Sequence, residues 1–446
     1  MWLEDSEIAC GACYSQYVIS NRILLASTGN EVTIDTLSNS GERSLAWSLN
    51  TRMRIIAQPV AVSDVGRAET LLVRLASGLE TRLARSSPLL TLGGWVSLDD
   101  LAIDDRVATP RWIPAPAHSK ELDYAEIVML AHMIGDGSCV KRQPIRYASI
   151  DEANLAAVTE AAAHFGITAI RDEYAAARVT TLRLPAPYRL THGRRNPIAA
   201  WLDELGLFGL RSYEKFIPAP VFAMPTDQVA LFLRHLWATD GSIRWDVRGR
   251  QAQIYYASTS LQLIRDVAQL LLRLEVHGRI TQARKPGYRD CWHLRIAGSE
   301  NQRTFLEDIS AHGARGIAGE AVLAEIVQLE PNPNVDTVPK EVWNTVRSSI
   351  AAQSMPLREF QSAMGSRFCG SAMWKNSPSR YRLARAAAIL EEPELILLAR
   401  SDVFWDRIVE ISSAGEQDVY SVTVDGTHNY VADGVLVHDS SVAAVR

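Results

Sequence analysis

The sequence predicts a multidomain α+β protein, and three observations predict that class. The chain has 446 residues, of which 47% are hydrophobic, so it is long and apolar enough for two or three domains with sizeable cores. Both ends of the chain are rich in short strand patterns. The middle mixes helical and strand patterns in an order that occurs twice. We therefore expect an all-β domain formed by the two ends of the chain, with an α/β domain inserted between them.

The all-β prediction rests on residues 22–108 and on the chain from residue 404 onward. In both regions short apolar runs, such as residues 70–75, alternate with Gly, Ser and Asp residues, as strands and turns do. A linker follows the first region and is marked by three prolines: Pro110, Pro114 and Pro116. The two β-rich regions are thus separated by more than half of the chain.

The inserted domain is predicted from an internal duplication between residues 122 and 328. An apolar helix that ends at Asp136 is followed by an alternating stretch and then by an amphipathic helix over residues 152–165. The second half repeats this order, with an apolar helix that ends at Asp240 and an amphipathic helix over residues 260–274. This repeat predicts a pseudo-two-fold α/β domain.

The two apolar helices end in matching Asp-Gly pairs, within LAHMIGDG at residues 130–137 and FLRHLWATDG at residues 232–241. An acidic residue at the end of an apolar helix is costly to bury without a partner. Two such helices packed side by side would bring Asp136 and Asp240 together, where like charges repel. A bound divalent cation would relieve that repulsion and supply chemistry for phosphodiester hydrolysis. Two buried helices, each stopped by a glycine, explain either motif alone but explain the matching pair less well.

This pair resembles the duplicated motif of LAGLIDADG (DOD-type) homing endonucleases of the kind carried inside inteins, and the second copy is the closer match. Residues 214–218, EKFIP, are similar to the Lys-x-Ile-Pro segment of that family. The resemblance implies a pseudo-two-fold αββαββα endonuclease domain over residues 118–330, with Lys215 as a catalytic lysine near the scissile phosphate. A lysine can serve there as a point charge or as a proton carrier. Taken alone, Lys215 reads as a solvated surface lysine.

The resemblance also implies a reaction and a cofactor. Asp136 and Asp240 would ligate Mg²⁺ (or Mn²⁺), which activates water and stabilises the leaving oxygen while double-stranded DNA is cut at a long recognition site. We expect a monomer, because the duplication already supplies a pseudo-dimer. Two residues of the motif helices, His132 and His235, depart from the pattern. His235 stands where the family has glycine, and we expect its bulk to separate the helices.

Positive charge for DNA binding is local, because the whole chain has a formal net charge of −5. The sheets of the repeat are expected to form a saddle over DNA, with six candidate phosphate or base contacts: Arg146, Arg244, Arg248, Arg250, Lys285 and Arg289. A Pro- and Asn-rich linker, residues 331–339, then leads into a segment with eight basic and two acidic residues between positions 340 and 390. We expect residues 331–400 to be a linker and a candidate DNA-recognition region, with three further contacts: Lys375, Arg380 and Arg382. An ordinary solvated helical face explains this segment equally well.

The end of the chain carries a second resemblance. Residues 419–440, VYSVTVDGTHNYVADGVLVHDS, resemble the C-terminal end of a Hint domain, the self-splicing fold of inteins, and WDRI at residues 405–408 fits the same family. Residues 22–108 resemble its N-terminal half more weakly. The resemblance implies a horseshoe-like all-β splicing domain formed by residues 16–112 and 401–439. The remaining flanks, residues 1–15 and 440–446, would be stubs of a host protein in cis.

Splicing makes specific demands on the C-terminal junction of such a domain. An Asn must cyclise onto its own backbone carbonyl with help from a preceding His, and a Cys, Ser or Thr must follow. Ser440 can serve as that downstream nucleophile, His438 holds the penultimate position, and His428 matches the second histidine of the family. Asp439, however, stands where Asn is usual. Two ordinary strand histidines are the alternative interpretation of His428 and His438.

The N-terminal junction departs further from the family. It falls near Gln16, which has no nucleophile, while Cys13 and Ser15 are out of register. The Thr-x-x-His segment that should polarise this peptide falls at residues 84–87, Ala-Arg-Ser-Ser, so both key residues are missing. We therefore expect the Hint frame to be kept while splicing, and N-terminal cleavage above all, is impaired.

Composition excludes several other classes of protein. No apolar stretch approaches the roughly 20 residues that span a membrane, and the acidic N-terminus lacks a signal-peptide pattern. The five cysteines fit a reducing cytoplasm better than a disulfide framework, and Cys10 and Cys13 form a lone Cys-x-x-Cys without a second half of a zinc site. Two alternatives to the endonuclease remain: an autoprocessing intein whose endonuclease is inactive, and a non-catalytic DNA-binding protein that reuses the duplicated fold.

Overall fold

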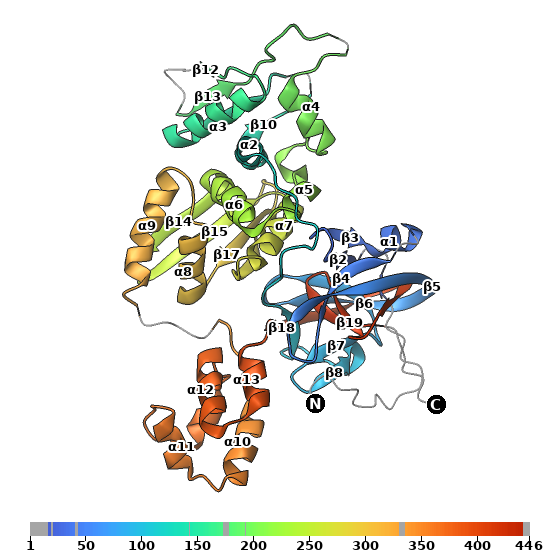
Figure 1. Ribbon diagram of the computed structural model, residues 1–446, viewed down its shortest axis with the longest axis vertical. Helices are drawn as coiled ribbons and strands as arrows, with labels where there is room; N and C mark the ends of the chain where they lie inside the picture. Colours follow the sequence, from blue (N-terminus) through green and yellow to red (C-terminus); the bar gives the residue numbers. More distant parts are fainter. Residues whose placement is uncertain are drawn as a thin grey trace. The chain divides into compact units, whose positions relative to one another are not determined.

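The computed structural model describes residues 17–18, 21–40, 43–141, 143–172, 178–191, 193–329 and 335–439. They form two compact units, of which the second is His118–Pro331 and the first combines the chain on either side of it. Helices and sheets occur in both units, so the predicted α+β class is confirmed (Figure 1). Among the described residues, no helix is both long and apolar enough to cross a membrane.

The first unit contains a six-stranded sheet whose two longest strands come from opposite ends of the chain. Strands β5 and β18 pair antiparallel along most of their length, from Leu75 opposite Ile408 to Val60 opposite Val424. The strand order is β4-β5-β6-β1-β18-β9, with bounds Ser44–Leu49, Ile55–Leu75, Glu80–Ala84, Tyr17–Val18, Val403–Val424 and Arg106–Pro110. The two β-rich regions of the sequence therefore contribute strands to the same sheet.

A second six-stranded sheet in the same unit is also shared between the chain ends. Its order is β3-β2-β19-β20-β7-β8, with bounds Glu31–Thr33, Arg22–Leu24, Asn429–Ala432, Val435–His438, Pro88–Thr91 and Gly94–Ser97. Two short helical segments, α1 (Ile34–Ser40) and η1 (Leu98–Asp100), connect its strands to others of the unit. Buried aliphatic side chains from both ends, such as Ile23, Val107 and Val437, share one core, and this burial holds the chain ends together.

The basic segment of the sequence is helical and belongs to the first unit. It comprises α10, α11, η3, α12 and α13, with bounds Val342–Ala352, Leu357–Ala363, Gly370–Lys375, Arg380–Leu390 and Pro393–Ala399. Trp343 and Phe360 are almost fully buried and provide its core. Glu391, in the left-handed conformation, ends α12, and Pro393 begins α13.

In the second unit, the first half of the repeat begins with α2 (Tyr124–Gly135), where Asp123 accepts a hydrogen bond from the backbone N–H of Ala125 as an N-cap. The half continues through β10, β11, α3, β12, β13 and α4, with bounds Gly137–Ser138, Arg146–Ser149, Glu152–His164, Ile170–Asp172, Thr180–Arg183 and Pro197–Glu204. Its strands form a four-stranded sheet in the order β10-β11-β13-β12.

The second half repeats this order of elements. After η2 (Ser212–Glu214) and α5 (Ala219–Phe222), it runs through α6, β14, β15, α7, β16, β17 and α8, with bounds Thr226–Asp240, Gly241–Asp246, Gln251–Ser258, Leu261–Leu272, Gly278–Ala283, Cys291–Ile296 and Ser299–Asp308. Its sheet has the same order, β14-β15-β17-β16, and a further helix, α9 (Ala314–Ile326), follows. The internal duplication read from the sequence is therefore present in the fold.

Candidate active site

Helices α2 and α6 pack against one another along apolar faces, which explains why both motifs are almost continuously hydrophobic. Met133 and Ile134 of α2 and Leu236 and Trp237 of α6 are at most 2% exposed and belong to the same core. Near their C-terminal ends the helices approach so closely that a Cβ atom on Gly135 would lie 2.0 Å from Thr239 Oγ1. A glycine is required at that point of contact.

The expectation that His235 separates the two helices is wrong. His235 is only 2% exposed, and its Nδ1 lies 3.1 Å from Nε2 of His132, which is fully buried on α2. His132 Nδ1 lies 2.9 Å from the hydroxyl of Tyr147 on β11, while the ring of His312 stacks on His235 at a centroid distance of 4.5 Å. The two imidazole rings fit between the helices because His235, His132 and the Tyr147 hydroxyl form a row of hydrogen-bonding contacts. Burial lowers the pKa of His132 well below its usual value and that of His235 to about 3, so both rings are neutral near pH 7.

The two aspartates lie at equivalent positions, where each motif helix gives way directly to a strand. Asp136 follows α2 and precedes β10, and Asp240 is the last residue of α6 and precedes β14. The following glycines allow these tight transitions, because a Cβ atom on Gly137 would lie 2.5 Å from Met133 Cα and one on Gly241 would lie 2.3 Å from the Trp237 carbonyl oxygen. Both aspartates are exposed to solvent.

The carboxylate of Asp240 is close enough to that of Asp136 to perturb its pKa. Partial desolvation, together with the charge of Asp240, raises the pKa of Asp136 to about 6. Desolvation also raises the pKa of Asp240. Two hard oxygen donors that resist ionisation together fit a divalent cation such as Mg²⁺, which commonly takes one or two carboxylates and completes its shell with water and phosphate oxygens. Across the described residues no set of three or more His, Cys, Asp and Glu side chains could hold a metal, so such an ion would need ligands from water or from a substrate.

Lys215 lies beside these aspartates, but in a buried position. It is 6% exposed, and its Nζ lies 2.9 Å from the carbonyl oxygens of Met133, Ile134 and Gly137 and 3.3 Å from that of Gly135. A solvated surface lysine is therefore the wrong interpretation. Burial lowers the pKa of Lys215, although Cys139, Asp240 and Asp136 oppose this shift. Its ammonium group neutralises the carbonyl-rich end of α2.

Arg315 is a site residue that the motif search missed. It lies at the start of α9, donates a hydrogen bond to the carbonyl oxygen of Ala238 in the last turn of α6, and lowers the pKa of both Asp136 and Asp240. A signal in the sequence could have found it. Lys215 follows Asp136 by 79 positions and Arg315 follows Asp240 by 75 positions, so each half of the repeat supplies one cation at nearly the same offset.

The six candidate DNA contacts of the repeat are all exposed. Arg146 lies on β11, Arg244 lies on β14, and the others occupy the β14–β15 turn and the loop between β16 and β17: Arg248, Arg250, Lys285 and Arg289. The polar face of the second sheet adds side chains that the sequence reading did not name. Tyr255 stacks on His293 at a centroid distance of 5.1 Å, and Arg295 lies opposite both Tyr255 and Arg279 in the register.

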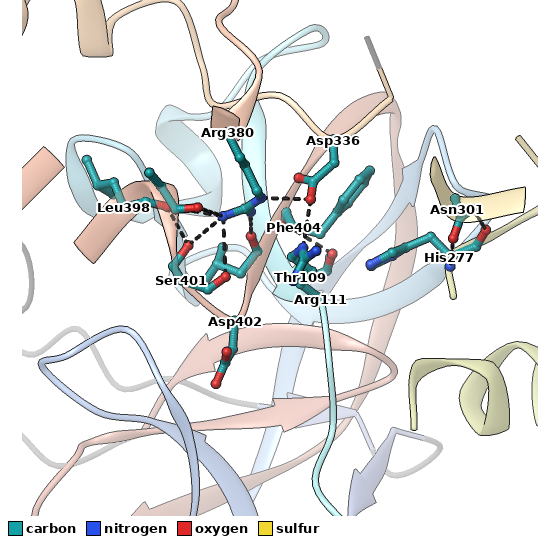
Figure 2. A network of polar contacts seen from close by, with 12 residues as sticks. Thr109, Arg111, His277, Asn301, Asp336, Arg380, Leu398, Ser401, Asp402 and Phe404 are labelled. Carbon is teal, nitrogen blue, oxygen red and sulfur yellow. Dashed lines mark hydrogen bonds and ion pairs between the residues drawn. The ribbon is translucent and has the colours of Figure 1, made fainter. Parts of the chain in front are cut away.

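The prediction that Arg380 contacts DNA is wrong. Its side chain is 13% exposed, and its guanidinium donates to Asp336, to the carbonyl oxygens of Leu398, Ala399, Ser401 and Val403, and to the Ser401 hydroxyl (Figure 2). Asp336 also accepts a 2.7 Å hydrogen bond from Arg111, which follows β9. Arg380 therefore connects the start of α12 to the first residue of β18. Of the other two predicted contacts, Lys375 is exposed and Arg382 lies over the Trp343 ring, 5.6 Å from its centroid.

The splicing residues that fall within the described chain lie together at the end of β20. The backbone N–H of Asp439 donates to the His428 carbonyl oxygen at 2.8 Å, and Asp439 Oδ2 lies 3.3 Å from His428 Nδ1. His438 Nδ1 lies 2.9 Å from the Asp439 carbonyl oxygen. Residues 84–87 form the turn between β6 and β7, where the Ser87 N–H bonds the Ala84 carbonyl oxygen. Cys10, Cys13, Ser15, Gln16 and Ser440 lie outside the described residues.

Comparison with known proteins identifies the second half of the repeat. Residues 227–310 match the family described as LAGLIDADG-like domain. The protein named Replicative DNA helicase DnaB of a Synechocystis species is 36% identical over 432 residues, which cover 94% of this chain and 48% of that protein. Protein RecA of Mycobacterium tuberculosis is 25% identical over 403 residues, which cover 85% of this chain and 50% of that protein. The chain thus spans about half the length of the curated relatives it matches.

Two kinds of solved structure are also similar to parts of this chain. A DnaB intein from a Synechocystis species covers 22% of this chain and 70% of its own, with 26% identity and a TM-score of 0.21. The homing endonuclease I-DmoI, in complex with DNA and Mn, covers 42% of this chain and 98% of its own, with 14% identity and a TM-score of 0.29. The family match over residues 227–310 confirms the resemblance of the second motif to LAGLIDADG proteins.

Proposed function

We propose, from the membership of residues 227–310 in the LAGLIDADG-like family, that this chain is a site-specific endonuclease that makes double-strand breaks in DNA. One observation carries the proposal. Asp136 and Asp240 end two helices in direct contact, and desolvation together with the charge of Asp240 raises the pKa of Asp136 to about 6. If these two positions had only a structural role, side chains without this unfavourable interaction would be expected there. A metal-dependent nuclease, in contrast, needs two carboxylates close together.

The chemistry assigned to each residue follows from its position. Asp136 and Asp240 would hold Mg²⁺ or Mn²⁺, which supplies an activated water and neutralises the leaving oxygen. Lys215 and Arg315 are held at the ends of α2 and α6 by backbone carbonyls and contribute positive charge where a scissile phosphate would lie. A direct contact of Lys215 with the phosphate would require it to give up carbonyl partners. We therefore propose that Lys215 acts first as a positioning residue.

DNA binding is proposed to use the open faces of the two sheets. Arg146 and Arg244 project from strands, and four basic side chains extend from the adjoining turns: Arg248, Arg250, Lys285 and Arg289. Long flexible cations at the rim suit phosphate contacts, whereas the Tyr255, His293 and Arg295 cluster on the sheet suits contacts with base edges. Lys375 and Arg382 remain proposed contacts of the helical segment, while Arg380 is excluded by its role in holding α12.

Cleavage of a randomised DNA library with Mg²⁺ tests the endonuclease proposal. We expect sequence-specific double-strand cuts from the unmodified chain and none from Asp136→Asn or Asp240→Asn. Asp203→Asn is a matched control, because Asp203 is an exposed carboxylate on α4 that pairs with Arg195. Binding of the library without cuts by the unmodified chain would overturn catalysis and would favour a DNA-binding protein that reuses the fold.

We further propose that protein splicing is impaired in this chain. Residues 84–87 lack the Thr and His that polarise the N-terminal peptide, and Asp439 replaces the cyclising Asn. Expressing the chain between two reporter proteins tests this: we expect the unspliced precursor and products of partial cleavage to accumulate. Efficient ligation of the two reporters would contradict it.

The host of this element is proposed to be a replicative DNA helicase. The relatives named Replicative DNA helicase DnaB match 94% of this chain but extend to about twice its length. Sequencing the transcript that encodes the chain tests the assignment, because helicase sequence should flank it on both sides. Flanks from an unrelated protein would refute it.

A further inference from the structure

The two cations beside the aspartate pair, Lys215 and Arg315, are held in the same crossed arrangement. Lys215 contacts the end of α2 in the first half of the repeat, and Arg315 contacts the last turn of α6 in the second half. The segment that carries each cation is bonded to the amphipathic helix of the other half, which is α7 for Lys215 and α3 for Arg315. Each cation is therefore placed by both halves of the repeat.

The segment that carries Arg315 is bonded to Asp151, the N-cap residue of α3. Asp151 Oδ1 accepts a hydrogen bond from the backbone N–H of Ala153 at 2.9 Å, and Oδ2 accepts one from the N–H of Ala314, the first residue of α9, at 2.7 Å. The carboxylate packs so closely that a Cβ atom on Gly313, whose φ is 66°, would lie 2.3 Å from Oδ2. One carboxylate thus satisfies a backbone N–H at the start of two helices, and the second helix directs Arg315 toward α6.

The segment that carries Lys215 is bonded in the same way to Ser260, the N-cap residue of α7. Ser260 is 2% exposed, and its hydroxyl accepts a hydrogen bond from the Leu263 N–H at 3.1 Å and donates one to the Lys215 carbonyl oxygen at 2.6 Å. Asp266, also on α7, accepts a hydrogen bond from the Ile217 N–H at 2.8 Å. The N-caps of α3 and α7 therefore have the same two tasks, which a carboxylate performs in the first half and a hydroxyl in the second.

We propose that Asp151 and Ser260 are positioning residues of the candidate active site, and that each holds the cation that acts at the motif helix of the other half. Neither helix end then receives its cation unless the two halves pack together. This assignment rests on the proposed nuclease function, but the placement of the two cations can be measured without DNA.

The carboxylate of Asp136 reports where Arg315 lies. Desolvation and the charge of Asp240 raise the pKa of Asp136, and the charges of Arg315 and Lys215 oppose this shift. Displacement of Arg315 should therefore raise the pKa of Asp136 further. Removal of the negative charge of Asp151 should by itself have the opposite effect, because fewer negative charges nearby favour ionisation. The direction of the change thus separates positioning from a direct charge effect.

Two variants of the full-length chain break the hydrogen bond between Asp151 and Ala314 from either side. Asp151→Asn keeps an oxygen that can cap α3, but its amide nitrogen cannot accept from Ala314. Ala314→Pro removes the donor and leaves the charge of Asp151 unchanged, and proline is favoured at the first position of a helix.

Carboxyl ¹³C NMR without metal or DNA measures the outcome. We expect both variants to raise the pKa of Asp136 by roughly half a pH unit or more, and the acid limb of the pH profile for DNA cleavage to move in the same direction. An unchanged pKa in both variants, or a decrease confined to Asp151→Asn, would overturn the role of Asp151. A raised pKa in a chain that cuts no DNA would refute the nuclease function but support the positioning of Arg315.

A double variant tests whether Asp151 acts through Arg315. In the Arg315→Met chain, Asp151→Asn should raise the pKa of Asp136 no further, because the cation that it positions is already missing. A second increase of the same size would refute action through Arg315. Asp203→Asn is the matched control, because it removes one negative charge from an exposed ion pair on α4.

Ser260 is tested through Asp240, because desolvation raises the pKa of Asp240 and the charge of Lys215 opposes this shift. Ser260→Ala should therefore raise the pKa of Asp240 further. Ser379→Ala is the matched control, since Ser379 is the N-cap of α12 and accepts a hydrogen bond from the Arg382 N–H. A pKa of Asp240 that is the same in both variants would overturn the role of Ser260.

Discussion

The ends of α2 and α6 carry equivalent aspartates, yet the protein stabilises them differently. At the end of α2, Lys215 is buried and lies within 3.3 Å of four carbonyl oxygens. At the end of α6, the half-buried Arg315 donates to the carbonyl oxygen of Ala238, which also accepts a 3.2 Å hydrogen bond from Asn154 Nδ2. Lys215 alone stabilises the end of α2, whereas Arg315 and Asn154 together stabilise the end of α6. The two carboxylates therefore occupy equivalent positions in the repeat, while the groups that stabilise the two helix ends differ.

The equivalence of the two carboxylates predicts the largest effect. Asp136→Asn and Asp240→Asn should each reduce the rate of DNA cleavage by about a thousandfold or more, since each removes one of two proposed metal ligands and several kcal/mol of charge stabilisation. Single-turnover cleavage of the selected DNA site measures both rates. If one variant cuts at the normal rate while the other is inactive, the two aspartates are not equivalent and one of them is structural.

The divergence of the supports predicts unequal losses of stability. Lys215→Met should lower the free energy of unfolding by about 3 kcal/mol, because four buried carbonyl oxygens lose their cation. Arg315→Met should lower it by about 1 kcal/mol, because Ala238 keeps the hydrogen bond from Asn154. Urea denaturation of both variants, with Arg303→Met on the exposed face of α8 as a control, measures the difference. Equal losses for Lys215→Met and Arg315→Met would contradict the asymmetry.

Much of this arrangement was predictable from the sequence, and the reasons differ by residue. The strand patterns of both chain ends and the duplicated helices follow from periodicity, which reports burial directly. Asp136 and Asp240 were predictable because an acidic residue at the end of an apolar run is costly. The burial of Lys215 was not predictable, because its partners are carbonyl groups that belong to every residue alike. Arg380 was misread for a similar reason: local charge density does not reveal that one arginine faces Asp336 and four carbonyl oxygens. His235 was misread as bulk, since its partner His132 is 103 positions away.

The aspartate pair also predicts how metal and pH affect stability. The pKa of Asp136 is raised from 3.8 to about 6 in the folded protein, so ionisation opposes folding. This penalty is absent below pH 3.8, grows as the pH rises, and is complete above about pH 6. At pH 7 without metal, Asp136→Asn should therefore unfold at a higher temperature than the unmodified chain, and the difference should vanish near pH 4.

Mg²⁺ should stabilise the unmodified chain alone, and a chelator should reverse that gain. Thermal scans across pH, with and without Mg²⁺, measure both effects, and an equal response of Asp136→Asn to Mg²⁺ would contradict the proposed site.

The stability that depends on the buried histidines should decrease as the pH falls, which is opposite to the trend for Asp136. The effect should be smallest near neutral pH. Folding lowers the pKa of His235 from 6.5 to about 3, so the stability that depends on its neutral form is present above pH 6.5 and is lost as the pH falls toward 3. His235→Gln retains a group that can bond His132 but cannot titrate, so it should lose less stability between pH 6.5 and pH 4 than the unmodified chain. His164→Gln is the control, because His164 lies at the end of α3, about a third exposed. Urea denaturation at several pH values measures the slopes. A parallel pH dependence for His235→Gln and the unmodified chain would show that the histidine row does not make the contact between α2 and α6 sensitive to acid.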